Sequence, residues 1–547
     1  MKLIECVPNF SEGRDRTVIG EITDAVGRVE GVRLLDVDPG AATNRTVVTF
    51  VGPPEAVERA AFSAIKRASE LIDMRTHHGE HPRMGATDVC PFVPLEGASM
   101  GDCIEIARRL GERVGRELAI PVFLYEHAAP EGRRSLADVR RGEYEGLQHR
   151  AQTPDFGPTY NASAGATAIG ARQFLIAYNV NLNTKDRRLA HRIAQAVREL
   201  GTPQRNEDGT VQKDANGQTV FEPGRFKEVK GVGWYIDEYR RAQVSLNLTD
   251  FSESPLHLVF DACREEAAKL GLRVTGSELI GLVPRRALLA AGDHYLTAQG
   301  ATTGAPEAER IQTAVLSLGL NELAPFDPNT KIIEYAFADR PGGLAGLPVA
   351  SFVDELSTAT PAPGGGSAAA LAGALGAALS AMVASLTYAK QGMESERPEM
   401  QDLGITAQDL KDWFVSAIDR DTDAFNAVLS ARRLPRSTPA ETEYRLAAIA
   451  AADLGATLVP LEVLERSVDA LELILTAARR GNPTSVTDAG VGGWCGLAAA
   501  EGASMNVRVN LNGLGGEHAG LLQRHDTALR KARELAAEIT RSVEERL

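Results

Sequence analysis

The residues FLIAYNVNL (174–182) begin the pattern that decides the fold of the first part of this chain. After them come a helical stretch at 186–200, the β-rich runs VKGVGWYI (229–236) and AQVSLNLTDF (242–251), a second helical stretch at 255–270, and RVTGSELIGLVP (273–284). Alternating apolar and β-branched residues predict strands, and amphipathic spacing predicts helices. The order of strand, helix, two strands, helix and strand is that of a split βαβ subdomain.

The same order occurs upstream of this pattern. Strands are expected at 3–7, 32–37, 45–51, 88–95 and 121–125, with helices at 54–74 and 100–118. We therefore predict an α+β part made of two sheet-plus-helix subdomains, residues 1–180 and 181–335, related by topology. The polar, turn-rich residues 206–224 are expected to form a hairpin or loop.

After a Gly- and Pro-containing linker at 336–348, the composition changes to Ala, Leu, Glu and Arg with helical periodicity. This predicts an all-α bundle over 349–547, with helices near 349–356, 367–390, 407–433, 442–478, 485–506 and 517–546. The uncharged stretch 367–388 is long enough to cross a membrane, but Ala, Gly and Ser dominate it. We favour a bundle helix that neighbours approach closely, expect no membrane partner, and expect a homo-oligomer.

Composition excludes several classes of partner. The chain of 547 residues is 44% hydrophobic and 24% charged and has a net charge of −14, which is typical of a globular protein and argues against nucleic-acid binding. Its five cysteines are scattered without CxxC spacing, and its N-terminus has no secretory pattern. A reducing cytoplasm is expected.

The segment GEHPRMGATD (79–88) is the first candidate site. His81 could exchange protons near neutral pH, and Arg83 could hold a substrate carboxylate in a two-pronged contact. The alternatives are an ordinary loop histidine and an ion pair of Arg83 with Glu80 or Asp88. We reject a metal at His77 and His78, because Gly79 and Pro82 disfavour the helical spacing of zinc-binding motifs.

Asp421 is the second candidate. It fills a gap in a helical stripe of apolar residues between Ile418 and Phe425, whereas Asp419 and Asp423 are expected to face solvent. Burial would raise the pKa of the Asp421 carboxyl and make it a proton shuttle. A helix cap or a buried ion pair explains the pattern equally well.

Several motifs of the first part resemble glutamate formimidoyltransferase. They are CVPNFSEG (6–13), GEHPRMGATDVCPFVP (79–94), FGPTYNASAGATAIGARQFLIAYNVNL (156–182), the stretch 229–251, and VTGSELIGLVP (274–284). The resemblance implies that His81 is the acid/base of the transfer. It also implies that the segment 157–165, with Gly157, Pro158 and Gly165, binds folate. TYNASA at 159–164 and Thr43 depart from the family pattern, where a Trp-containing segment and a histidine are expected.

The helical part resembles the formimidoyltetrahydrofolate cyclodeaminase family. The motifs are PAPGGGSAAALAGALGAAL (361–379), DRDTDAFNAVLSARRLP (419–435), GNPTSVTDAG (481–490) and MNVRVNL (505–511). The resemblance places the catalytic aspartate at Asp421. Backbone N–H groups at the start of a helix suit an anion, so Gly364, Gly365, Gly366 and Ser367 are candidates for the folate tail. Weaker candidates for folate contacts are Asn482, Asp488, Asn506 and Asn510, for which helix caps are the ordinary explanation.

The two resemblances together imply a bifunctional enzyme of histidine degradation and one-carbon metabolism. It would transfer a formimino group from N-formimino-glutamate to tetrahydrofolate, and then cyclise the product to 5,10-methenyltetrahydrofolate with release of ammonia. Tetrahydrofolate, with or without a polyglutamate tail, would be the co-substrate, and no metal is expected. One alternative is a methenyltetrahydrofolate cyclohydrolase as the helical part. The other is a folate-binding scaffold that lacks one activity, which the departure at Thr43 leaves open.

Overall fold

The computed structural model describes residues 2–41, 44–79, 83–130, 134–150, 152–337, 343–514 and 518–547. It separates into two compact units, each treated by itself below. Met1–Ala290 with Val315–Asp339 form the first, and Ala291–Ala314 with Arg340–Leu547 form the second. The second half of α8 (Arg285–Ala298), most of α9 (Glu307–Leu318) and the chain between them therefore pack with the helical unit, although sequence analysis assigned them to the sheet-containing part. Thr302 Oγ1, for example, donates to Gln401 Oε1 at 2.6 Å.

The first sheet is mixed and has seven strands within the described residues. Its strands are β1 (Ile4–Cys6), β2 (Asn9–Phe10), β3 (Arg33–Gly40), β4 (Arg45–Gly52), β5 (Thr87–Pro94), β6 (Val122–Glu126) and β7 (Thr167–Ala171). β1 and β2 both pair with β4 and β5, and β3 pairs with the outer side of β4. The order β3, β4, β1 with β2, and β5 is the pairing order of a split βαβ unit. Beyond β5, β7 and then β6 extend the sheet with parallel pairing.

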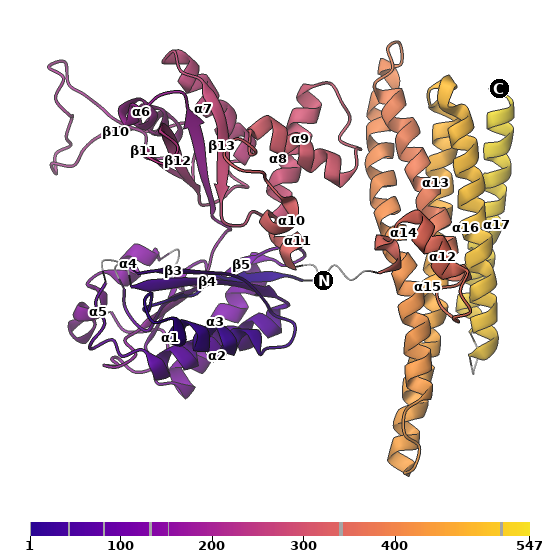
Figure 1. Ribbon diagram of the computed structural model, residues 1–547, viewed down its shortest axis with the longest axis horizontal. Helices are drawn as coiled ribbons and strands as arrows, with labels where there is room; N and C mark the ends of the chain where they lie inside the picture. Colours follow the sequence, from indigo (N-terminus) through magenta and orange to yellow (C-terminus); the bar gives the residue numbers. More distant parts are fainter. Residues whose placement is uncertain are drawn as a thin grey trace. The chain divides into compact units, whose positions relative to one another are not determined.

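Helices cover one face of this sheet (Figure 1). They are α1 (Arg16–Gly27), α2 (Pro54–Leu71) and α3 (Met100–Glu117), and the short α4 (Leu136–Arg140) and α5 (Glu143–Gly146) follow β6. Apolar side chains such as Phe50, Phe92 and Ile65 are buried between strands and helices. Every residue of β5 is buried, which explains the apolar run at 89–94.

The second sheet repeats the pairing order in a purely antiparallel form, β11-β12-β8-β13. Its strands are β8 (Ile176–Leu182), β11 (Val229–Ile236), β12 (Arg241–Leu248) and β13 (Val274–Ile280). α6 (Arg187–Val197) and α7 (Leu256–Lys269) lie on one face (Figure 1). The predicted pair of split βαβ subdomains is confirmed. The passage between them lies before β8, a few residues earlier than the boundary expected at residue 180.

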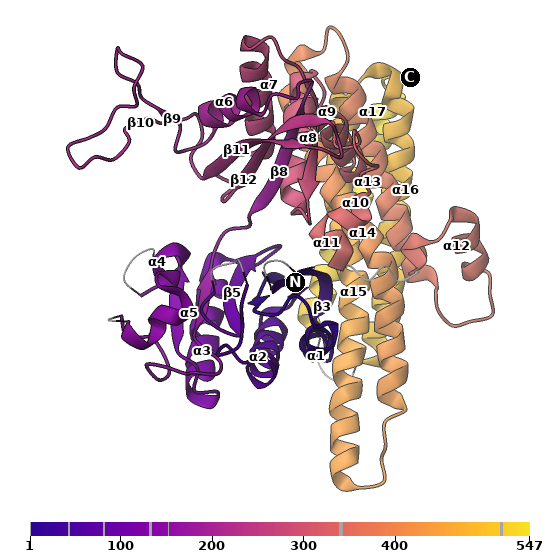
Figure 2. The same cartoon turned by 60° about the vertical axis from the view of Figure 1, so that its left-hand side comes forward.

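The polar residues 206–224 extend from the second sheet as paired segments (Figure 2). β9 (Thr202–Pro203) pairs with β10 (Phe221–Glu222), and isolated bridges continue the pairing at Arg205–Val211 and Lys213–Thr219. The expected hairpin is therefore present. The remaining helices before the bundle are α8 (Arg285–Ala298), α9 (Glu307–Leu318), α10 (Pro328–Lys331) and α11 (Ile333–Phe337).

The helical unit is a bundle of helices, as predicted, and all but the first of them are long. They are α12 (Val349–Leu356), α13 (Gly365–Tyr388), α14 (Arg397–Arg432), α15 (Pro439–Arg480), α16 (Val486–Gly513) and α17 (Ala519–Glu544). α14 and α15 extend beyond their neighbours as a helical hairpin (Figure 2). The α15 N-terminus carries a capping box, in which Thr438 and Glu441 each bind the other residue's backbone N–H.

α13 is the central helix of the bundle and packs against α14, α15 and α16. By length and hydropathy α13 and α15 could each cross a membrane. In α13, however, small residues serve helix packing. A Cβ on Gly373 would lie 2.5 Å from the Phe414 ring, and one on Gly376 would lie 3.1 Å from the Gly492 carbonyl oxygen. This is the close approach expected of a bundle helix.

Candidate active sites

The first candidate site lies where the chain enters β5. His81, Glu80 and Pro82 lie outside the described residues, so the acid/base role of His81 stays a prediction. The residues that follow them are held tightly. The Gly85 and Gly165 backbones form an antiparallel bridge, the Ala86 N–H donates to the Ala164 carbonyl at 2.8 Å, and the Ala166 N–H donates to the Met84 carbonyl at 3.0 Å. The structure thus joins two segments that the sequence predicted separately.

Gly165 is needed for this junction. Its φ is +70°, and a Cβ there would lie 2.2 Å from the Met84 carbonyl oxygen. Gly157, at the other end of the predicted folate segment, packs instead against Gly115 of α3 and the Ile120 carbonyl. Pro158 is exposed. Only the Gly165 end of the segment therefore adjoins the segment after His81.

Of the two acids considered in the sequence analysis, Glu80 lies outside the described residues, and Asp88 pairs with Arg140 instead of Arg83. The Arg83 guanidinium donates to both Glu145 oxygens, at 2.7 and 2.9 Å, and lies 3.4 Å from Glu143. The Arg83 side chain is only 9% exposed, whereas that of Glu145 is 62% exposed. Asp88 is buried in an ion pair with Arg140 and accepts the Met84 N–H at 3.0 Å. Glu145 comes from a separate helical turn, so no local sequence signal marked it as the partner.

His77 and Asn44 also organise this site, although sequence reasoning assigned them no role in it. His77 Nε2 lies 3.0 Å from the Asn44 carbonyl oxygen, and Arg83 Nε donates to His77 Nδ1 at 3.4 Å. Burial lowers the pKa of the His77 imidazole, so the neutral ring can accept from Arg83. Asn44 in turn accepts the Gly13 N–H and donates to the His78 carbonyl. The segments that contain Gly13, Asn44 and Arg83, far apart in sequence, therefore meet here.

Asp421 lies in α14 against the first turn of α13. Ser367 Oγ donates to Asp421 Oδ2 at 3.4 Å and to the Ile418 carbonyl at 2.9 Å. Burial raises the pKa of the Asp421 carboxyl, and hydrogen bonds from Ser367 oppose that rise. A Cβ on Gly366 would lie 2.0 Å from Asp421 Oδ1, so only glycine leaves room for the carboxylate there. The direction of the pKa shift is the one that the helical pattern predicted.

The neighbouring acids differ from each other. Asp423 is exposed, as expected. Asp419, which was expected to face solvent, instead accepts the Leu344 N–H at 2.7 Å and the Ala345 N–H at 3.4 Å. It caps the short 3₁₀ turn Leu344–Gly346 before α12, a tertiary contact that the α14 sequence pattern alone does not reveal.

The weaker candidates divide between the two ends of α13. Gly365 lies beside Asn506, where its Cβ would be 3.9 Å from Asn506 Nδ2, so Asn506 is near the Asp421 end. Asn482 lies at the other end, because its backbone N–H donates to Thr387 Oγ1 at 2.8 Å. The 20 residues from Ser367 to Thr387 span about 30 Å of helix. Within one chain Asn482 therefore does not lie beside Asp421, and its predicted folate contact stays a prediction.

Asp488 likewise lies at the end of the bundle away from Asp421, whereas Asn510 follows Asn506 by one helical turn at the other end of α16. Asp488 is in the first turn of α16, near Asn482, and Asn510 donates to the Ala456 carbonyl of α15. The Asn482 side chain caps the turn Pro483–Ser485, as its ordinary explanation held. Gly364 has nothing within 4 Å of its Cβ position, so it is open to solvent or ligand.

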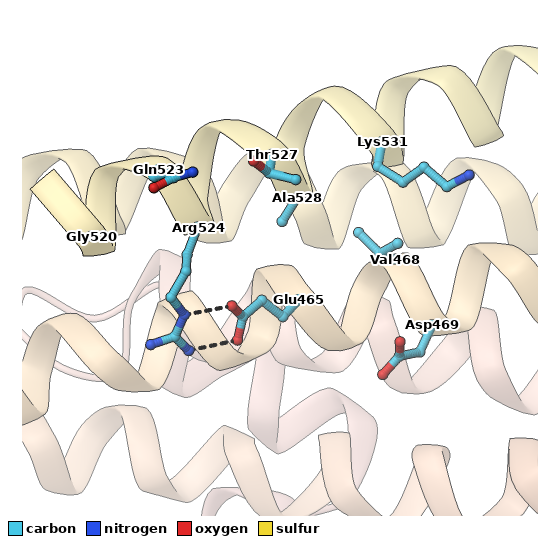
Figure 3. Close-up of a pocket in the computed structure, with 9 residues that line it drawn as sticks. All are labelled: Glu465, Val468, Asp469, Gly520, Gln523, Arg524, Thr527, Ala528 and Lys531. Carbon is cyan, nitrogen blue, oxygen red and sulfur yellow. Dashed lines mark hydrogen bonds and ion pairs between the residues drawn. The ribbon is translucent and has the colours of Figure 1, made fainter.

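A groove between α15 and α17 contains none of the predicted residues (Figure 3). Its cavity volume is about 410 Å³. The Arg524 guanidinium at its edge donates two hydrogen bonds, at 2.8 and 2.9 Å, to the Glu465 carboxylate. Since these charges already neutralise each other, we assign the groove no role in the chemistry.

The chain consists of a sheet-containing half and a helical half, and each half contains one candidate proton-transfer segment. This arrangement defines a two-site enzyme. Family models match both halves: the formiminotransferase domain, N-terminal subdomain, at 3–172; the formiminotransferase domain at 177–338; and formiminotransferase-cyclodeaminase at 348–520. Formimidoyltransferase-cyclodeaminase from Rattus norvegicus is 42% identical over 100% of this chain and 99% of its own length. The chain belongs to the formimidoyltransferase-cyclodeaminase family.

Two shorter relatives each match one half. Glutamate formimidoyltransferase from Streptococcus pyogenes is 42% identical over 54% of this chain and 93% of its own length. Methenyltetrahydrofolate cyclohydrolase from Methylorubrum extorquens is 36% identical over 30% of this chain and 80% of its own. Because relatives named for both activities match the whole chain, the bifunctional interpretation is favoured over the cyclohydrolase alternative. The chain is an enzyme that transfers the formimino group to tetrahydrofolate and then cyclises and deaminates the product.

Proposed function

We propose that His81 moves the protons of the transfer step. Nitrogen 5 of tetrahydrofolate attacks the formimino carbon and loses a proton, and the glutamate nitrogen leaves and gains one. One imidazole can accept the first proton and return it to the leaving nitrogen. The observation that supports this role is the bridge between Gly85 and Gly165, which holds the segment after His81 against the predicted folate segment.

We propose that Arg83 binds a carboxylate of formimino-glutamate by exchanging it for Glu145. The guanidinium is buried, and its present partner is an exposed side chain that can rotate away into solvent. Because the substrate carboxylate would take the place of Glu145, the buried charge of Arg83 stays paired throughout the exchange.

The Glu145→Gln enzyme should show a KM for formimino-glutamate about two- to fivefold lower, because the competing carboxylate is gone. Steady-state kinetics with tetrahydrofolate held at saturation measures this. Glu143→Gln is the matched control, since Glu143 lies farther from the guanidinium, at 3.4 Å. A higher KM together with a lower melting temperature would mean that Glu145 is the structural partner of Arg83.

We propose that Asp421 relays protons in the second reaction. Nitrogen 10 of folate loses a proton as it closes on the formimino carbon, and the departing nitrogen gains protons and leaves as ammonia. A carboxyl whose pKa is raised by burial can serve both transfers near neutral pH. The backbone N–H groups that begin α13, at Gly364–Ser367, would bind an anionic part of the folate tail.

We propose that tetrahydrofolate is the co-substrate of both sites and that neither reaction uses a metal. We also propose that the protein is located in the cytoplasm. All five cysteines are free thiols, including Cys6 and Cys90, whose Sγ atoms are 3.6 Å apart. Unpaired thiols suit a reducing compartment. Fractionation of the producing cells tests the location, and retention of both activities after chelator treatment tests the metal.

We propose a homo-oligomer in which a second copy covers the exposed apolar surface of α13 and α16. On α13 the exposed residues Leu375, Met382 and Leu386 follow one another at helical spacing, and Leu375 is 50% exposed. Val491 and Trp494 of α16 extend this surface, since Gly376 and Gly492 bring the two helices together. Exposed apolar side chains gathered on two adjacent helices are typical of an interface.

Sedimentation velocity should therefore show a species larger than one chain. Charge placed on this surface, as in Met382→Glu with Trp494→Glu, should shift it towards the monomer. The matched control is Val349→Glu, at an exposed apolar residue of α12. A wild-type monomer at micromolar concentration, or binding of the wild type to lipid vesicles, would contradict the proposal.

A further inference from the structure

The face of the second sheet opposite α6 and α7 carries a polar network. In the strand register Trp234, Gln243 and Asn181 stand side by side on this face, and Asn179 pairs with Glu278. Asn181 and Gln243 are completely buried. A buried amide costs free energy unless it is hydrogen-bonded, so the network indicates that this face has a defined arrangement.

Hydrogen bonds fix the orientation of every amide. The Trp234 indole can only donate, and its Nε1 donates to Gln243 Oε1 at 2.9 Å. Gln243 Nε2 must then point the other way, where it donates to Asn181 Oδ1 at 2.7 Å and to Glu278 Oε1 at 2.9 Å. Asn179 Nδ2 donates to the same Glu278 oxygen at 3.0 Å.

The result is a carboxylate held in place but not neutralised. Arg241, the cation at the end of this face, pairs with Glu322, which also accepts from Asn181 at 2.7 Å. Among the described residues Glu278 has no ion pair, and both of its hydrogen bonds are made by Oε1. Its Oε2 is therefore available as an acceptor. The charge of Glu278 also raises the pKa of the nearby Tyr239 hydroxyl.

Around Glu278 the face is open and partly apolar. Trp234 is 40% exposed, Val232 48% and Ile280 52%. A flat aromatic side chain beside an oriented carboxylate is suited to a planar ligand with paired N–H donors.

We propose that Glu278, held by Asn179 and Gln243 beside Trp234, binds an amidine-type edge of a substrate, in which one carbon carries two N–H donors. Two substrates of the transfer have this chemistry: tetrahydrofolate, through the aminopyrimidinone edge of its pterin, and N-formimino-glutamate, through its formimino group. This assignment rests on the transferase activity, but it adds a binding site that none of the motif-based candidates includes.

The test measures ligand binding and kinetics on the full chain. Glu278→Gln keeps the shape of the side chain but removes the acceptor charge, so one ligand should bind about tenfold or more weakly. The probes are 5-formyltetrahydrofolate, which does not react, titrated by tryptophan fluorescence, and formimino-glutamate, measured by its KM. Glu238→Gln removes one charge from the exposed hairpin of the same sheet and should change neither value.

Each outcome decides the proposal. A weaker 5-formyltetrahydrofolate complex alone identifies the pterin, and a higher KM for formimino-glutamate alone identifies the formimino group. The proposed site is overturned if neither the affinity for 5-formyltetrahydrofolate nor the KM for formimino-glutamate changes, or if both ligands bind more weakly by the same factor. Should Glu278→Gln unfold, Trp234→Phe tests the same site. Its 5-formyltetrahydrofolate binding is measured by titration calorimetry, because the variant lacks the fluorophore of the site, and the same ligand should bind it more weakly. A wild-type chain without transfer would contradict the transferase assignment, while the fluorescence titration would still report on Glu278.

Discussion

The Asp421→Asn enzyme is expected to lose about 10²- to 10⁴-fold of its cyclodeaminase activity while transfer is retained. Asparagine has nearly the shape of aspartate, so it can keep the contact with Ser367, but it cannot take up or release the proton. The measurement is ammonia release from supplied 5-formimidoyltetrahydrofolate, with transfer assayed in parallel. Loss of both activities in a folded variant would contradict two independent sites.

The same variant should unfold less easily at neutral pH. Because burial raises the native pKa of Asp421, the native state holds this proton more tightly than the unfolded state does. Stability therefore falls as pH rises from the unfolded pKa, about 3.9, through the raised native pKa. Asparagine has no such loss, so the difference in melting temperature between variant and wild type should grow with pH. If the difference in melting temperature does not change with pH, the native pKa of Asp421 is not raised.

Gly366 offers an independent way to disturb the same carboxyl. In Gly366→Ala the new Cβ would lie 2.0 Å from Asp421 Oδ1, so the carboxylate must move. Cyclisation should fall with transfer unaffected. Gly455→Ala in α15 is the matched control, because nothing lies within 4 Å of its Cβ position and it belongs to neither candidate site.

The His81→Ala enzyme is expected to lose transfer and to retain cyclisation, the reverse of Asp421→Asn. Transfer from formimino-glutamate should fall by about 10²- to 10⁴-fold, because alanine can neither accept the proton of nitrogen 5 nor protonate the departing nitrogen. Cyclisation of supplied 5-formimidoyltetrahydrofolate should continue at the wild-type rate. Methenyltetrahydrofolate absorbance, followed with each starting substrate, separates the two reactions.

His78→Ala provides the control for this variant. His78 is an exposed histidine three residues before His81, and only its backbone carbonyl takes part in a described hydrogen bond, with Asn44. Its loss should leave transfer unchanged. If His78→Ala and His81→Ala lose the same fraction of transfer activity, both substitutions act by disturbing the backbone of this segment, and His81 has no special role.

Local pattern predicted most of the architecture of this protein. The alternation in 174–182 and the helical stretches after it define the split βαβ order, because side-chain periodicity of two or 3.6 follows from backbone geometry alone. The same reasoning placed Asp421 on the packed side of α14, and burial raises its pKa in the expected direction. Motif resemblance identified the two reactions, which no periodicity could do.

Contacts between residues far apart in sequence were decided by the tertiary structure. Three findings depend on how separate segments dock. Glu145 is the partner of Arg83, Asp419 is a cap, and Asn482 lies about 30 Å of helix from Asp421. The Glu278 network depends on docking too, since its members come from β8, β11, β12 and β13. The sequence alone determined which elements form and which chemistry the chain contains, since these follow from local geometry and residue type. Only the tertiary structure determined which polar groups satisfy one another, because a hydrogen bond requires atoms within about 3 Å, which spacing along a chain cannot guarantee.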